Sequence, residues 1–158
     1  LLYARADSGR SLAKDTIEIQ PVIEETVRQM RLLDTNRHIN LDVPSKFEII
    51  GDRDALKQVM MILLDNAIKH SDGDIDIGVR LNDPALEIQV QDYGDGIAQD
   101  ELSHVFDRFY RVEDQVSGDG FGLGLPIAKA LVESMGGVIM IKSILGKGSV
   151  VIAQFFSQ

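Results

Sequence analysis

The sequence predicts an α+β fold, a two-layer α/β sandwich in which a mixed, mostly antiparallel sheet packs on about three helices. Apolar residues recur at helical spacing in a few long stretches and alternate with polar residues in several short ones. The short stretches toward the C-terminus are joined in pairs by tight turns, whereas a parallel βαβ series requires a helix between consecutive strands. These observations favour hairpins packed on helices.

Alternation with period two predicts the strands. They lie at residues 16–20, 39–43, 47–50, 74–81, 86–91, 138–143 and 149–156. Turn-forming residues occupy 82–85 and 146–148, so we expect two antiparallel hairpins in the C-terminal half.

Helical spacing predicts the helices. Three longer ones lie at residues 21–33, 52–70 and 125–135, and a short one at 99–108. Pro21 suits the first position of a helix, because its missing N–H needs no partner there. Asp52 is a good N-cap, and Gly136 and Gly137 end the last helix.

The chain of 158 residues has the size and composition of one globular domain, with 44% hydrophobic and 26% charged residues. Residues 1–11 have the character of a helix tail and a linker, so we place the domain at 12–158. A formal net charge of −9 argues against a nucleic-acid partner, which requires clustered Lys and Arg. No stretch approaches 18 consecutive apolar residues, so we expect no direct membrane contact by this fragment.

A polar patch interrupts the apolar face of the 52–70 helix. Asn66 lies one turn from both Lys69 and His70 and shares a face with them. Lys69 and His70 are equally compatible with a helix end that meets solvent. Asn66 has apolar neighbours, and a buried amide without partners costs about 1–3 kcal/mol, so we expect Asn66 to face a ligand.

Two glycine-rich segments suggest ligand contacts. Asp92 ends a strand and precedes Gly94 and Gly96, so its carboxylate can accept from an amine while the backbone approaches a ring, although acidic glycine turns are also common. Residues 118–124 contain four glycines directly before a helix, and a helix N-terminus is a ready phosphate site. Neither the P-loop nor the dinucleotide-binding glycine pattern is present.

Five motifs, in family order, resemble those of bacterial sensor histidine kinases. NAIKHS at 66–71 resembles the N box, DYGDGI at 92–97 the G1 box, FDRFYR at 106–111 the F box, GFGLGL at 120–125 the G2 box, and GKGS at 146–149 the final glycine-rich turn. The resemblance covers residues 12–157. It implies the ATP-binding catalytic domain of such a kinase, with the Bergerat ATP-binding fold.

The resemblance also implies site residues for ATP and Mg²⁺. Asp92 would read the adenine amino group, Asn66 would hold Mg²⁺, and a flexible ATP lid would span about 107–121. The implied catalytic residues are Asn66, Lys69, Arg108 and Arg111. The implied nucleotide-binding residues are Asn66, Lys69, His70, Asp92, Gly94, Gly96, Ile97, Tyr110, Gly120, Phe121, Gly122, Leu123, Gly124, Leu125 and Ser149. Phe106 is equally compatible with a role as a core anchor.

The resemblance names two protein partners. One is the parent's own dimerisation and phospho-acceptor domain, which is a helical hairpin. Residues 1–6 of this chain resemble the tail of that hairpin. The other partner is the receiver domain of a response regulator. His38, His70 and His104 all lack the sequence context of an acceptor histidine. We therefore expect the acceptor histidine to lie outside this chain. We expect the chain itself to be a cytoplasmic domain of a membrane-anchored parent protein.

Ile62 departs from the family pattern. It stands four residues before Asn66, where these kinases commonly carry Asn or a carboxylate that helps to hold the metal. The water-activating Glu of related ATPases is also absent there, which disfavours ATP hydrolysis by that route. The alternative is a nucleotide-gated regulatory module with weak or no phosphoryl transfer, while the F box disfavours an anti-sigma-type serine kinase.

Overall fold

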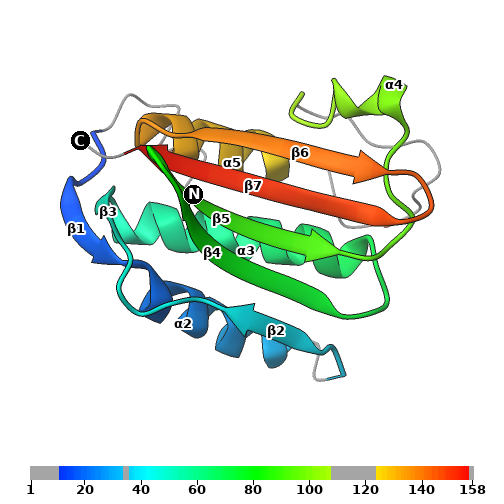
Figure 1. The fold of residues 1–158 in the computed structure, drawn as a ribbon, viewed down its shortest axis with the longest axis horizontal. Coiled ribbons are helices and arrows are strands. Elements are labelled where there is room, and N and C mark those ends of the chain that lie inside the picture. The colour runs from blue at the N-terminus through cyan, green and yellow to red at the C-terminus, as the bar shows by residue number, and fades with distance from the viewer. Residues whose placement is uncertain (1–10, 34–35, 108–123, 157–158) are drawn as a thin grey trace.

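The computed structural model has two layers, a five-stranded sheet and the helices that cover one of its faces (Figure 1). It describes residues 11–33, 36–107 and 124–156. The strand order is β2-β4-β5-β7-β6. These strands are β2 (Ile39–Asp42), β4 (Ile75–Asn82), β5 (Ala85–Asp92), β6 (Val138–Ile144) and β7 (Gly148–Phe156).

The sheet is mixed, as predicted. The β4–β5 and β6–β7 hairpins are antiparallel, and β5 pairs antiparallel with β7. β2 runs parallel to β4 at one edge. A separate two-stranded sheet joins β1 (Asp15–Glu18) to β3 (Glu48–Gly51).

The helices of the second layer are α2 (Ile19–Arg31), α3 (Arg53–Lys69) and α5 (Gly124–Ser134), and a short α4 (Gln99–Leu102) follows β5. Buried apolar residues of α3, among them Leu56, Leu63 and Leu64, pack in one core with Ile77 and Ile88 from the inner face of the sheet. Asp52 caps α3 as predicted, because its Oδ1 accepts from the N–H of Ala55 at 3.0 Å. Within the described residues, none of the helices has the length and apolar character of a membrane span.

Several predicted boundaries differ from the structure, and two of the differences have a clear physical reason. α2 begins at Ile19 rather than Pro21, because the Ile19 N–H finds its partner in the carbonyl of Phe47 at 3.1 Å, and Pro21 falls within the first turn, where N–H groups have no intrahelical partner. α4 ends at Leu102 rather than near residue 108. Hydrogen bonds between residues three apart replace the helical pattern, with the His104 N–H donating to Glu101 and the Asp107 N–H to His104.

This architecture brings three chain segments together at one end of the sheet. β5 ends at Asp92, which is paired in register with Ser149 at the start of β7. Ser149 is paired in turn with Ser143 near the end of β6. The C-terminus of α3 packs behind the loop that follows Asp92.

Candidate functional site

Asp92 is a buried carboxylate at the end of a central strand. Its side chain accepts from the N–H of Gly94 at 2.9 Å, and the residue is only 3% exposed. Burial raises the pKa of this carboxyl above its ordinary value, although the N–H groups of Gly94 and Ser149 act in the opposite direction. The carboxylate oxygens of Asp92 can therefore accept a further hydrogen bond, from a ligand N–H that takes the place of the water excluded by burial.

The C-terminal turn of α3 lies next to Asp92. His70 is the C-cap and is half-buried; burial lowers its pKa, and the nearby Asp92 charge opposes that shift. Asn66 is also half-buried, and its amide has no side-chain hydrogen bond among the described residues. Lys69 lies 3.0 Å from the carboxylate of Asp65, so in this structure it pairs within its own helix.

The loop of residues 93–97, here called the 93–97 loop, packs against backbone on both sides. A Cβ on Gly94 would lie 1.8 Å from the carbonyl oxygen of His70. Gly96 has φ +73°, and a Cβ there would lie 2.2 Å from the carbonyl oxygen of Ile144. The predicted glycines are thus required by close approach of α3 on one side and of the β6–β7 hairpin on the other.

Ser143 was not predicted as a site residue. Its hydroxyl lies 2.7 Å from the Ile97 N–H, 2.7 Å from the Ser149 hydroxyl and 3.0 Å from the Gly148 carbonyl oxygen. Ser143 points to the helix-covered side of β6 together with Ile139 and Ile141. A serine in an inward-facing, otherwise apolar position is the sequence signal that would have indicated it.

Arg37 also supports the site, although no sequence pattern indicated it. Its guanidinium donates to the carbonyl oxygens of Ile68 at 3.1 Å and Ser71 at 2.7 Å, and to the Ser71 hydroxyl at 3.0 Å. These acceptors lie at the C-terminal end of α3, where carbonyl groups lack intrahelical partners. Arg37 therefore holds the turn on which Gly94 packs.

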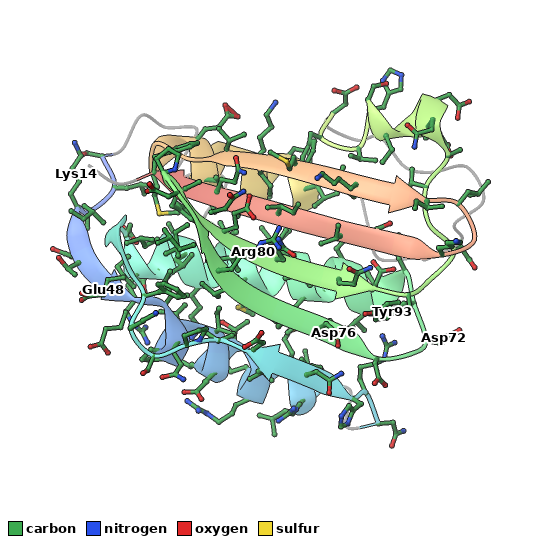
Figure 2. The ribbon with its side chains drawn as sticks, in the orientation of Figure 1. Lys14, Glu48, Asp72, Asp76, Arg80 and Tyr93 are labelled. Atoms are coloured by element: carbon green, nitrogen blue, oxygen red, sulfur yellow. The ribbon has the colours of Figure 1, made fainter. Side chains whose placement is uncertain are left out.

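Tyr93 is fixed from the outer face of the sheet. Its hydroxyl donates to Asp76 on β4, and the side-chain amide of Asn40 on β2 donates to the same carboxylate at 2.7 Å. Figure 2 shows Tyr93 and Asp76 side by side at this end of the sheet. The hydrogen bond from Tyr93 lowers the pKa of Asp76, and the carboxylate raises the pKa of Tyr93.

The remaining predicted residues divide into two groups. Gly124 begins α5 and Leu125 packs against the core, close to α3: a Cβ on Gly124 would lie 3.5 Å from Cγ2 of Ile62. Phe106 also packs against the core, with the ammonium of Lys129 5.9 Å from its ring centroid, as its interpretation as an anchor requires. Outside the described residues lie Arg108, Tyr110, Arg111, Gly120, Phe121, Gly122, Leu123 and most of the predicted lid.

Comparison with known families gives the assignment. Residues 51–157 match the family described as histidine kinase-, DNA gyrase B-, and HSP90-like ATPase. The chain belongs to this family. Membership implies that it binds ATP, and the resemblance to sensor histidine kinases is confirmed by the relatives of this ATPase domain.

One relative is the sensor protein CiaH of Streptococcus pneumoniae serotype 4, 41% identical over 106 residues that cover 65% of this chain. The match covers 24% of CiaH, so the ATPase domain spans about a quarter of that relative. Among solved structures, the mycobacterial sensor histidine kinase MprB has a TM-score of 0.81 and 26% identity, covering 91% of this chain and 97% of that one. Full-length ShkA in complex with AMPPNP has a TM-score of 0.78 and 26% identity, covering 99% of this chain and 34% of that one.

Proposed function

We propose that this ATPase-family domain is the catalytic domain of a two-component sensor histidine kinase. It would transfer the γ-phosphoryl group of ATP to a histidine on its parent's dimerisation domain, for relay to a response regulator. The observation that carries the proposal is the buried, raised-pKa carboxylate of Asp92 beneath the 93–97 loop. The solved structure of MprB, which is named a sensor histidine kinase, supports the same reaction class.

In this proposal Asp92 recognises adenine. A carboxylate is an acceptor only, so it pairs with the 6-amino group of adenine and discriminates against a 6-oxo purine. Gly94 and Gly96 bring backbone close to the ring, and half-buried Ile97 supplies apolar contact. Ser149, paired with Asp92 across the sheet, completes this wall.

Asn66 is the proposed ligand for Mg²⁺. Magnesium takes oxygen ligands and usually keeps several waters and substrate phosphate oxygens, so one protein oxygen is compatible with binding. The Asn66 amide fits because it has no side-chain partner in the described part of the chain. When bound, the metal would neutralise phosphate charge; Lys69, released from Asp65, and the arginines at 108 and 111 would add positive charge.

The proposed transfer needs no strong base. A neutral imidazole nitrogen attacks the γ-phosphorus with its lone pair, and the bond from that phosphorus to the β–γ bridging oxygen breaks. ADP leaves, and the N–H proton of the imidazole passes to solvent. Imidazole is largely neutral near pH 7 and is already nucleophilic.

Nucleotide titration tests the base pocket. We expect ADP to bind more tightly than IDP, which carries a 6-oxo group in place of the 6-amino group. Asp92→Asn should weaken ADP by at least about tenfold, since a hydrogen bond to a charged acceptor contributes roughly 1.5–3 kcal/mol. Equal binding of ADP by Asp92→Asn and the unaltered domain would contradict this assignment.

Phosphoryl transfer is tested by mixing the domain with a histidine-bearing hairpin domain and labelled Mg·ATP. The expected product is an acid-labile phosphohistidine. If ATP binds and no phosphohistidine forms, the alternative of a nucleotide-gated regulatory module replaces the proposal. Ile62→Asn then provides the second arm: under the alternative, the added oxygen ligand should create transfer activity.

A further inference from the structure

We propose that Ser143 is a positioning residue that holds the 93–97 loop in the geometry required to distinguish adenine from 6-oxo purines. The inference rests on the proposed function, because it assumes that Asp92 reads the base. It adds a residue that lies on a different hairpin from Asp92 and that makes its contacts to protein groups.

The hydroxyl of Ser143 joins three segments of the chain. It bonds to the Ile97 N–H at 2.7 Å, across a separation of 46 residues, and to Gly148 and Ser149 at the start of β7. The carbonyl oxygen of the same residue accepts from the side-chain amide of Gln99 at 3.4 Å, at the first residue of α4. Ser143 therefore connects both the 93–97 loop and the helix after it to the β6–β7 hairpin.

The Ser143 hydroxyl uses all of its hydrogen-bonding capacity on protein groups. A serine hydroxyl donates one hydrogen bond and accepts two. The Gly148 carbonyl oxygen can only accept, so Ser143 donates to it, and the Ile97 N–H and the Ser149 hydroxyl must both donate to Ser143. The residue is 7% exposed, and no hydrogen-bonding capacity remains for a ligand. Its influence on a nucleotide must act through the loop.

The other attachments of the loop act at different points. At its first residue, the Tyr93 hydroxyl donates to Asp76 on the outer face of the sheet. The Gly94 N–H bonds to Asp92 at the beginning of the loop, and the Gly146 N–H donates to the carbonyl oxygen of Asp95 at 2.6 Å in its middle. The Ser143 bond fixes its end, at Ile97. Without it, the loop remains attached at its first half, while the backbone that faces the base is free to shift relative to Asp92.

The test compares affinities for ADP and IDP in Ser143→Ala, with Ser134→Ala as the matched control. Ser134 loses an equivalent hydroxyl bond, to Ala130 at 2.8 Å, at an exposed position on α5. We expect Ser143→Ala to reduce the ADP preference over IDP by roughly three- to tenfold, the size of one weakened hydrogen bond, with little change for IDP. Ser143→Thr keeps the hydroxyl and should restore the preference; a purely structural role would lower the melting temperature and leave the ratio unchanged.

Hydrogen exchange of the unaltered domain covers the case in which Ser143→Ala does not fold. The Ile97 amide should be protected relative to an unbonded loop amide, and exchange at an unprotected rate would overturn the proposal. The proposal would also be overturned if the unaltered domain prefers ADP over IDP and Ser143→Ala keeps that preference in full. Equal affinity of the unaltered domain for ADP and IDP would instead refute the role of Asp92, on which the inference depends.

Discussion

Gly94 lies against the carbonyl oxygen of His70 so closely that a Cβ at residue 94 would stand 1.8 Å from it. Two backbone segments thus meet without a side chain between them, the end of α3 and the loop after β5. Because neither can retreat without breaking its own hydrogen bonds, any side chain at residue 94 must displace the loop.

Gly94→Ala should therefore impair both folding and nucleotide binding. We expect a loss of about 1–3 kcal/mol in the free energy of unfolding, the usual cost of overpacking, and a large loss of ADP affinity. Urea denaturation and ADP titration measure the two effects. Gly73→Ala is the matched control, since a Cβ at residue 73 would meet nothing within 4 Å; equal behaviour of the two variants would contradict the packing argument.

The pH dependence of base recognition follows from the burial of Asp92. Its pKa is raised, so the carboxylate becomes protonated at a higher pH than an ordinary aspartate. The preference for ADP over IDP should be complete above that pKa and fall as the pH drops through it. Taking the ratio of the two affinities removes the effect of phosphate protonation, which both ligands share. Asp92→Asn should show a small, pH-independent ratio.

Asp52 should contribute to stability in two ways. Its Oδ1 caps α3, and its Oδ2 accepts from the N–H of Ala13 at 3.0 Å, joining the start of the domain to the central helix. We expect Asp52→Ala to lower the free energy of unfolding by about 1–2 kcal/mol in urea denaturation, and Asp52→Asn to recover most of it. Asp54→Ala, an exposed first-turn carboxylate, should cost less than about 1 kcal/mol.

Arg37 should be a stability determinant that lysine cannot fully replace. Arg37→Ala leaves the Ile68 and Ser71 carbonyl oxygens without their charged donor, which costs about 1–3 kcal/mol. Both carbonyl oxygens accept from Nη2 of Arg37, and Nη1 donates to the Ser71 hydroxyl; a lysine ammonium lacks this planar set of donors, so Arg37→Lys should be intermediate. The exposed Arg28 supplies the control, with a change within about 0.5 kcal/mol expected on Arg28→Ala. Full stability of Arg37→Ala in thermal unfolding would be inconsistent with this role.

The predictable parts of the fold are those encoded by local signals. The cap at Asp52 and the hairpins on either side of residues 83–84 and 145–147 follow from neighbouring residues, and all were predicted. The parallel pairing of β2 with β4 was not, because the two strands are separated by α3 and nothing within either one specifies its neighbour. The start of α2 was misplaced for the same reason: the partner of the Ile19 N–H is Phe47, 28 positions away.

The residues of the site also differ in whether local sequence could predict them. Asp92, Gly94 and Gly96 occur in one short motif and were predicted from it. Ser143 and Arg37 act at Ile97 and Ser71, which are distant in sequence. Their participation depends on tertiary packing. Of these two residues, only Ser143 is indicated by the sequence, because it is a polar residue among inward-facing isoleucines.

Three glycines around the site, Gly94, Gly96 and Gly148, limit sequence variation there by close contact with backbone. A Cβ on Gly94, Gly96 or Gly148 would in each case meet a main-chain oxygen, of His70, Ile144 and Asp92 respectively. Main-chain oxygens are the same whatever side chain their residue carries, so replacing His70 or Ile144 leaves the shape of these contacts unaltered. The packing requirement is therefore one-sided: it excludes a side chain at each glycine and sets no side-chain requirement on the residue that supplies the oxygen, so Ile144, which has no assigned role in nucleotide binding, should tolerate substitution.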